Sequence, residues 1–293
     1  MKSQIGQIET LIHRDVGRGM DAVFAATRGG LWRAATALAA TPTPAIGLIA
    51  GFFIPNADPP AAETDGPAAA ALMALGFLQA GLTCRLATDT ICQSACRAAL
   101  DAAGAGCVPI DAVAPGGEVG TLTDRWREAG IDWAIAIERC GPAADGRIRN
   151  MRGAEITQWV ASLDRLFGAG PWRTIGIGDG GNELGMGNVS VAAGLKLGDV
   201  ARCTVPADFL IAAGVSHWGA YAMLAALALL RPDWSAAMLS GLDPALDRAV
   251  VEAMVRDGPA VDGVSLRREA TIDGLAMAEH GAVMEAVRAL VGR

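Results

Sequence analysis

Residues 176–188, GIGDGGNELGMGN, combine a flexible backbone with oxygen donors directly after an apolar run. Five of the ten residues 176–185 are glycine, so the backbone can approach a ligand closely and adopt positive φ angles. Asp179, Asn182 and Glu183 add side-chain oxygens to the same loop. Carboxylates on a glycine-rich backbone are typical of a site for a hard divalent cation rather than for a bare phosphate. The loop therefore predicts a Mg²⁺ or Mn²⁺ site, with Ca²⁺ as an alternative.

Residues 176–181 also fit the Gly-x-Gly-x-x-Gly fingerprint of dinucleotide-binding folds, and Asp199 lies about where that motif places an acid. Two features oppose this interpretation. Asp179 and Glu183 would direct negative charge at a pyrophosphate, which needs amide donors. The fingerprint also normally belongs to the first strand and helix of the fold, whereas this one lies late in the chain. We therefore favour the cation over the dinucleotide.

Carboxylates also follow other apolar runs: Glu63 and Asp65 after the first predicted strand, and Glu138 after the fourth. Because ligands bind beyond the carboxyl ends of parallel strands, we expect all five acids around one cavity. Their mutual repulsion would raise their pKa values unless a cation neutralised them. We predict that Glu63, Asp65, Asp179 and Glu183 bind the metal, and that Asp179, Glu183 and Glu138 are catalytic. The alternative is that these acids lie in solvated turns, with Asp65 and Asp179 as helix N-caps.

Groups that could hold an anionic substrate are predicted at the same edge of the sheet. Arg139 and Arg152 both follow the fourth predicted strand, and arginine forks onto carboxylates or phosphates. The alternative is that these arginines pair with the nearby acids. Asn150 adds an amide contact. The other predicted substrate contacts come from the two motif loops and are Thr64, Gly180, Gly181 and Asn182.

His217 is the only histidine in a predicted site loop. Residues 214–219, GVSHWG, lack the Gly-x-Ser-x-Gly spacing of a nucleophile elbow, because the second glycine comes one residue too late. A serine hydrolase is therefore not favoured. We predict a catalytic role for His217, as a general base or a metal ligand. The alternative is an imidazole that only packs at the start of a helix.

The elements that must position these loops read as an α/β fold. Six short apolar runs predict buried strands at residues 45–54, 84–87, 107–110, 133–137, 174–178 and 209–213. Alanine-rich segments between them predict helices at residues 68–80, 91–103, 121–129 and 155–167. This alternation predicts a largely parallel or mixed sheet covered by helices on both faces. We expect a single α/β domain over residues 1–293, with a helical N-terminal segment (1–40), a sheet-bearing core (41–215) and a mainly helical C-terminal part (216–293).

Composition excludes several classes of protein. A chain with 52% hydrophobic and 19% charged residues is compact rather than disordered. The net charge of −7, with no run rich in arginine or lysine, argues against a nucleic-acid partner. The longest apolar run, residues 219–230, is too short to cross a bilayer, and no N-terminal secretion signal is present, so we expect a cytoplasmic protein with no membrane partner. Trp218 and Trp234 could line a subunit interface or a core, so a homo-oligomer stays open.

The six cysteines are scattered and form no Cys-x-x-Cys pair. Cys92 and Cys96 lie four residues apart on a predicted helix, but their neighbourhood offers no further zinc ligands. We therefore expect buried thiols that pack as small hydrophobic groups.

Three motifs together resemble the D-glutamate cyclase family, whose domain was long catalogued as one of unknown function. They are Glu63-Thr64-Asp65-Gly66-Pro67, Asn150-Met151-Arg152-Gly153 and residues 177–187. The resemblance extends from about Gly17 to the helix after Ser216. Two positions depart from the family pattern: Ala50, where the family tends to have threonine, and His217, where it tends to have asparagine. Both bear on substrate preference and on cyclase activity.

The resemblance implies a lyase of the hydro-lyase type that converts D-glutamate, a small acidic amino acid, into 5-oxo-D-proline with loss of water. The predicted site suits this chemistry. A bound cation could polarise the γ-carboxylate, a carboxylate or His217 could deprotonate the α-amine, and an arginine could hold the α-carboxylate. A metal-dependent phosphohydrolase and a non-catalytic module that binds a small metabolite are the alternatives.

Overall fold

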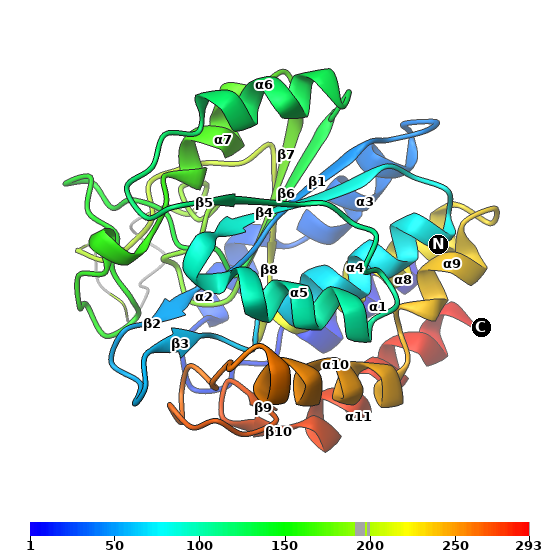
Figure 1. Cartoon of the computed structure of the whole chain (residues 1–293). Helices are drawn as coiled ribbons and strands as arrows, with labels where there is room; N and C mark the ends of the chain where they lie inside the picture. Colours follow the sequence, from blue (N-terminus) through cyan, green and yellow to red (C-terminus); the bar gives the residue numbers. More distant parts are fainter. Residues whose placement is uncertain (191–196, 198–199, 293) are drawn as a thin grey trace.

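Six parallel strands form the central sheet in the part of the chain that the computed structural model describes, residues 1–190, 197 and 200–292 (Figure 1). Asp199 lies outside the described residues. In spatial order the strands are β5 (Ile110–Val113), β4 (Cys84–Asp89), β1 (Ile46–Ile49), β6 (Trp133–Ile137), β7 (Arg173–Gly178) and β8 (Phe209–Ala212). The predicted α/β fold is therefore confirmed. The strand order reverses at β1 and β6, and such a switch point is where α/β sheets bind ligands.

Helices cover both faces of the sheet, but the two layers differ in thickness (Figure 1). On one face, branched and aromatic side chains such as Leu48 and Ile135 contact a thick layer of helices. This layer contains α1 (Lys2–Ile12), α3 (Gly30–Ala39), α4 (Pro67–Gln79), α5 (Gln93–Ala102), α8 (Ser216–Leu230), α9 (Ser235–Ser240), α10 (Pro244–Asp257) and α11 (Met277–Val291). The other face is covered by α2 (Asp21–Thr27), α6 (Gly120–Glu128) and α7 (Leu163–Ala169).

Small residues on the thinner face let other groups lie directly on the sheet. A Cβ atom at Gly47 would come within 2.3 Å of the Trp126 ring, so the indole packs on bare backbone there. A Cβ atom at Gly176 would come within 2.3 Å of the Leu184 carbonyl oxygen. Glycine at this position therefore brings the loop after β7 back across its own strand, which places the glycine-rich motif at the end of the sheet.

Several elements differ from the predicted ones. The first predicted strand ends at Ile49, because Gly51 has a φ of 109° and turns the chain into a hairpin of β2 (Phe53–Ile54) and β3 (Ala61–Ala62). The predicted helix at 155–167 is instead a 3₁₀ turn, η2 (Thr157–Trp159), followed by α7. A second 3₁₀ turn, η1 (Thr90–Cys92), precedes α5.

The C-terminal part contains a short hairpin that the helical prediction missed. Strands β9 (Thr271–Ile272) and β10 (Leu275–Ala276) pair antiparallel. Asp273 and Gly274 form the two-residue turn with φ angles of 55° and 74°. An Asp-Gly pair is a strong signal for this turn, because both central residues need positive φ.

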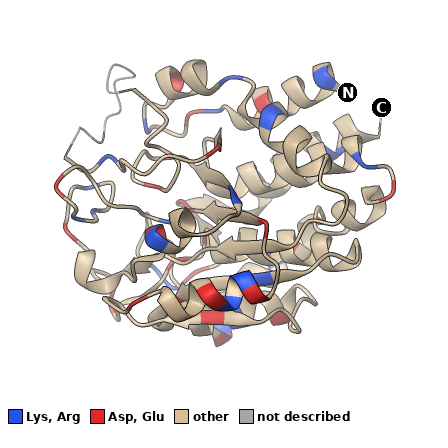
Figure 2. Ribbon diagram, turned by 90° about the horizontal axis from the view of Figure 1, so that it is seen from above, with Lys and Arg blue, Asp and Glu red and all other residues tan. Residues whose placement is uncertain are grey.

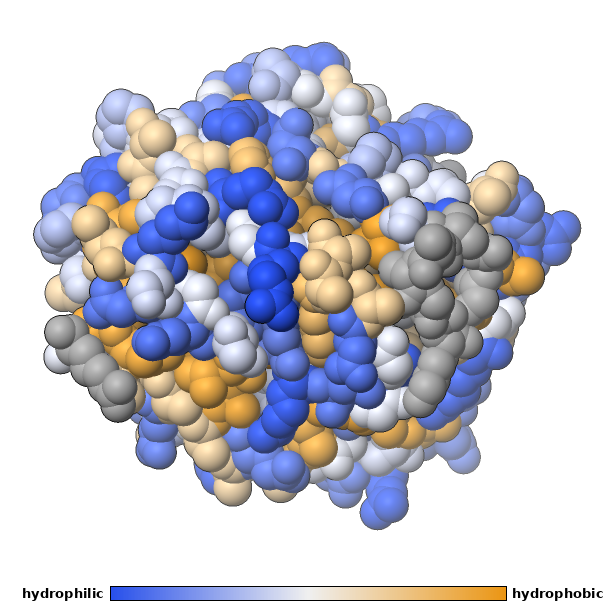
Figure 3. Space-filling model, turned by 180° about the vertical axis from the view of Figure 1, so that it is seen from behind, coloured by the Kyte–Doolittle hydropathy of each residue, from blue (hydrophilic) through white to orange (hydrophobic). Residues whose placement is uncertain are grey.

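Helices α4 and α8 are buried along almost their whole length, since they lie between the sheet and the outer helices. None of the described helices is both long and apolar enough to cross a membrane. Acidic and basic residues are interspersed over the ribbon in Figure 2. On the face shown in Figure 3, hydrophilic and hydrophobic residues likewise alternate.

Candidate active site

The structure brings the five predicted carboxylates together at the carboxyl end of β6 and β7. Oxygens of Glu138, Asp179 and Glu183 lie within 4.8 Å of one another, and oxygens of Asp65, Asp179 and Asp273 do the same. Asp179 belongs to both groups and directly follows β7, while Glu138 directly follows β6. Glu138 has a φ of 45°, which is uncommon for a residue other than glycine.

A cavity of about 210 Å³ opens onto this cluster. Glu63 and Glu138 line its acidic side, with Arg18 and Asp273 beside them and Arg152 on the rim. The rest of the wall comes from Phe52, Ile54, Asn56, Asn150, Met151, Asn182, Gly263 and Val264. Pockets for drug-sized ligands are about 300–1,000 Å³, so this cavity suits a smaller metabolite.

Arg18 and Asp273 are site residues that the sequence reasoning missed. The Arg18 guanidinium pairs with Asp179 at 2.5 Å and with Asp273 at 2.6 Å. Asp273 reaches the cluster on the Asp-Gly turn between β9 and β10, a signal that was present in the sequence. Asp262 supports that turn by accepting a hydrogen bond from the Gly274 amide at 2.8 Å. Arg18 precedes α2 in an irregular segment that carries no comparable signal.

Burial and crowding raise the pKa values of the clustered carboxyls. Burial is the largest cause of the raised pKa of Glu63, Asp65, Glu138 and Asp179, and repulsion from neighbouring carboxylates adds to it. For Asp179, the Arg18 guanidinium opposes the shift without reversing it. Further positive charge is therefore needed before all of these groups can ionise together.

The glycine-rich loop binds its own glutamate. The Glu183 carboxylate accepts hydrogen bonds from the amides of Gly180 at 2.8 Å and Gly181 at 2.7 Å, and a longer one from Asp179 at 3.3 Å. These consecutive amides form an anion-binding concavity. The prediction that Gly180 and Gly181 contact the substrate needs correction, since their amides are occupied. Oxygens of Glu183, Glu138 and Asp179 also lie within 4.8 Å of one another, so the catalytic and metal-binding roles of Glu183 stay predictions.

Arg139 is the second correction, because its guanidinium lies away from the cavity. It is 1% exposed and pairs with Asp89. It also donates to the carbonyls of Gly51 at 2.7 Å and Ala161 at 2.8 Å. Arg139 therefore forms a structural ion pair, as in the alternative, but its partner Asp89 is not one of the five predicted acids.

The other predicted substrate contacts divide into two groups. Thr64 donates to the Thr271 carbonyl at 2.8 Å and so ties the β9–β10 hairpin to the site loop instead of facing a ligand. Asn150, Arg152 and Asn182 line the cavity. The Asn150 side-chain oxygen accepts from two amides of its own loop. Arg152 is exposed, and its guanidinium makes one hydrogen bond among the described residues, to the Val264 carbonyl at 3.2 Å, so it keeps donors for a ligand.

Neither Asp65 nor Asp179 caps the helix that follows it. The N-cap of α4 is Gly66. Asp179 accepts instead from the Ser216 amide at the start of α8, at 2.7 Å. The Ser216 hydroxyl donates to Glu138 at 2.5 Å. The N-terminus of α8 therefore holds two carboxylates of the cluster, as expected for the positive end of a helix dipole.

His217, in the first turn of α8, is completely buried. One ring nitrogen, Nε2, lies 2.7 Å from the Asp247 carboxylate, whose other oxygen accepts from the Tyr221 hydroxyl. The second nitrogen, Nδ1, lies 3.9 Å from Asp65 and has no hydrogen-bond partner among the residues that the structure describes. Nδ1 of His217 is therefore on the side of the ring nearer the acid cluster.

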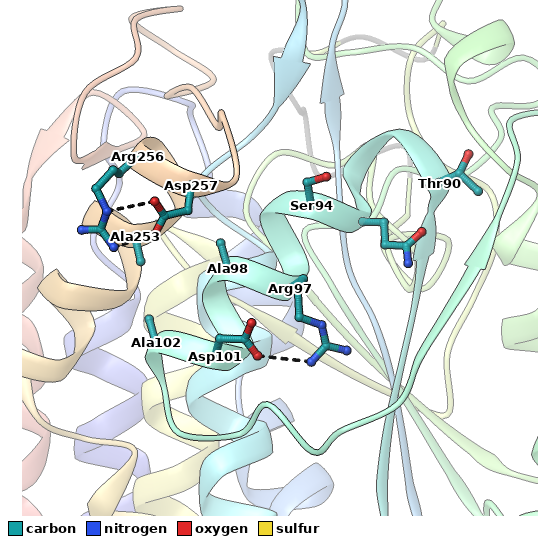
Figure 4. A pocket seen from close by; sticks show the side chains of 10 residues that line it. Thr90, Ser94, Arg97, Ala98, Asp101, Ala102, Ala253, Arg256 and Asp257 are labelled. Carbon is teal, nitrogen blue, oxygen red and sulfur yellow. Dashed lines mark hydrogen bonds and ion pairs between the residues drawn. The ribbon is translucent and has the colours of Figure 1, made fainter.

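A larger cavity, of about 570 Å³, lies between α5 and α10 and contains none of these residues (Figure 4). Its charged side chains pair with one another: Arg97 with Asp101 at 3.4 Å, and Arg256 with Asp257 at 2.5 Å. Because these pairs are solvent-exposed and already neutralised, the groove offers no free charge for a ligand.

The fold and the cluster define an α/β protein with an acid-lined cavity beyond the carboxyl ends of its strands. Residues 8–288 match the model of the family described as D-glutamate cyclase-like, C-terminal, and the chain belongs to this family. The human protein named D-glutamate cyclase, mitochondrial, is 47% identical over 106 residues. That match covers 34% of this chain and 17% of the human protein, so the chain matches less than a fifth of that relative's length.

Proposed function

We propose that this chain cyclises D-glutamate to 5-oxo-D-proline with loss of water, assisted by a divalent cation. The proposal is carried by the buried carboxylate cluster that opens onto a cavity of about 210 Å³, in a member of this family. The cavity also suits the substrate's charges, since both acidic and basic side chains line it, including the exposed Arg152.

The reaction forms one bond and breaks one. The α-nitrogen attacks the γ-carboxyl carbon, a C–N bond forms, and a C–O bond breaks. Two of the three ammonium protons leave with the departing oxygen as water, and the third stays on the lactam nitrogen. The protein must therefore carry protons from nitrogen to oxygen while holding both ends of the substrate in a bent conformation.

Different residues at the cavity can transfer the protons, bind the substrate and hold the cation. Glu138 faces the cavity and is held by the Ser216 hydroxyl, so we assign proton transfer to it. Arg152 would bind the α-carboxylate through its free guanidinium donors. Glu63, Asp65, Asp179 and Asp273 would hold the cation. Oxygens of Glu63, Asp65 and Asp273 are buried without a hydrogen-bond partner among the described residues, which fits a hard oxygen-binding ion.

A bound divalent cation would polarise the γ-carboxylate and stabilise the oxyanion that develops on it. Mg²⁺ and Mn²⁺ are the ions that such a donor set favours. A phosphohydrolase is less well supported, because the loop amides that would hold a phosphate are already occupied by Glu183.

The test is product analysis. Metal-stripped protein would be incubated with D-glutamate or L-glutamate, with and without Mn²⁺, and 5-oxoproline measured by chiral chromatography. We expect product from D-glutamate with Mn²⁺, above the uncatalysed rate, and little from Glu138→Gln. Arg152→Ala should raise KM, with a loss of about ten- to hundred-fold in kcat/KM. Asp179→Asn should weaken metal binding. Binding of D-glutamate without turnover would favour the non-catalytic module instead.

A further inference from the structure

His217 directs one ring nitrogen, which lacks a hydrogen-bond partner among the described residues, toward the acid cluster. Its imidazole is completely buried, and Nδ1 has no hydrogen-bond partner among the described residues. The nearest acidic group is Asp65, whose Oδ1 lies 3.9 Å from Nδ1. A buried polar atom without a partner costs about 1–3 kcal/mol, so this nitrogen needs a partner that the protein atoms do not supply.

The other ring nitrogen of His217, Nε2, already has a hydrogen-bond partner, Asp247. One oxygen of the Asp247 carboxylate accepts from the Tyr221 hydroxyl, and the other lies 2.7 Å from Nε2 of His217. Because a carboxylate oxygen accepts, Nε2 donates this hydrogen bond. In the neutral ring this leaves a lone pair on Nδ1, directed toward the cluster. Histidines that bind metals have this arrangement, with the second ring nitrogen donating to a carboxylate.

The separation of Nδ1 and Asp65 distinguishes two roles. A protonated Nδ1 that paired with the carboxylate would lie about 2.7–2.9 Å from it. Two atoms bound to one ion at about 2.1 Å lie about 3.0 Å apart at a right angle and about 4.2 Å apart on opposite sides. The observed 3.9 Å is too long for a direct hydrogen bond between the two groups and falls within the range for two ligands of one ion.

Asp65 lies beside two carboxylates that already have a cationic partner. Oxygens of Asp65, Asp179 and Asp273 lie within 4.8 Å of one another, and Arg18 pairs with Asp179 and Asp273. Among the described residues, no arginine or lysine pairs with Glu63 or Asp65. Glu63 Oε2 and Asp65 Oδ2 are both buried without a hydrogen-bond partner.

We propose that His217 binds the divalent cation through Nδ1 beside Asp65, with Asp247 and Tyr221 as the residues that orient it. This inference rests on the cation of the proposed function and deepens it. A nitrogen ligand shifts the preference of the site from Mg²⁺ and Ca²⁺ toward Mn²⁺ and other transition ions. We expect Mn²⁺ to bind at least ten-fold more tightly than Mg²⁺.

Pulsed electron paramagnetic resonance on the Mn²⁺-loaded wild-type protein tests this directly, because a bound imidazole gives a ¹⁴N modulation that changes on ¹⁵N-histidine labelling. We expect the modulation in wild type, its loss in His217→Phe, and its persistence in His280→Gln. His280 is the matched control, since its Nδ1 accepts from the Trp218 indole at 2.9 Å and is not free.

Affinity measurements complete the test. Asp247→Asn should weaken Mn²⁺ binding about 10- to 100-fold, the usual effect of removing a partner that orients a metal-bound histidine. Bound Mn²⁺ without a histidine signal would overturn the inference and leave the proposed cyclisation intact. Failure of the wild-type protein to bind Mn²⁺ would overturn both the inference and the metal assistance. The wild-type signal needs no substitution, so a misfolded variant cannot obscure the result.

Discussion

Replacing Arg139 with methionine should unfold the protein more easily without changing substrate affinity. The guanidinium is 1% exposed and lies between the buried Asp89 carboxylate and two backbone carbonyls. Methionine fills much of the volume but leaves Asp89 with the Ala161 amide, at 2.5 Å, as its remaining hydrogen-bond donor. An uncompensated charge is then buried beneath the loop that leads into the site.

The expected loss of stability depends on Asp89, which keeps its charge when Arg139 is removed. Removing one partner of a buried ion pair typically costs about 3–5 kcal/mol, mostly because the other charge is left unpaired. The carbonyls of Gly51 and Ala161 also lose a charged donor, which places the expected loss toward the upper end of that range. If Asp89 is the cause, Asp89→Leu combined with Arg139→Met should recover a large part of the stability.

Urea unfolding followed by circular dichroism measures the loss, and steady-state kinetics measures KM in the folded protein. Arg152→Met is the matched control, because the guanidinium of this exposed arginine makes one hydrogen bond among the described residues, at 3.2 Å. It should change stability by no more than about 0.5 kcal/mol while raising KM. A loss below about 1 kcal/mol in Arg139→Met, together with a raised KM, would show that Arg139 is a substrate ligand and refute the structural role.

Two further predictions concern ionisation. Because burial raises the pKa values of Glu63, Asp65, Glu138 and Asp179, the folded metal-free protein binds protons more tightly than the unfolded chain. The stabilisation that these groups give the folded protein is therefore present below their ordinary pKa values and is lost as pH rises. Tm should fall as pH rises from about 5.5 to about 8, and Mn²⁺ should raise Tm more at the higher pH. A calorimetric Tm that did not change over this range would contradict the prediction. Burial also raises the pKa values of Cys84, Cys96 and Cys203 to about 12, and Cys107 is the exposed one of the six thiols. Ellman's reagent should therefore titrate one thiol in the native protein and six in denaturant, and rapid reaction of several native thiols would count against the buried packing.

The sheet could be predicted because parallel strands buried on both faces leave continuous apolar runs. The edge strand was misplaced by a few residues. The apolar run at 107–110 contains Pro109, which precedes β5 and supplies only a carbonyl, to the Leu86 amide. The strand itself, Ile110–Val113, is partly exposed and has a weaker pattern. The β9–β10 hairpin was missed because two-residue strands leave no periodicity.

The site could be predicted only where it follows strand ends. Asp179 and Glu138 directly follow β7 and β6, so the topology alone brings them to one edge. Whether a polar group faces a ligand or the protein depends on contacts that one sequence does not reveal. Glu183 turns back onto its own loop, and Arg139 turns toward Asp89. Asp247 reads as a surface acid of α10 until packing buries it against His217.

The salt bridge between Arg18 and Asp273 joins two segments that are far apart in the sequence. During translation the ribosome delivers Arg18 before any strand of the sheet, and Asp273 after all six strands of the sheet. A chain cut or stalled before the β9–β10 hairpin would hold every strand of the sheet, yet it would lack one carboxylate of the cluster and the Thr271 carbonyl that anchors Thr64. Assembly of the acid cluster therefore waits for synthesis of the β9–β10 hairpin, and a product truncated before this hairpin would carry an incomplete cluster.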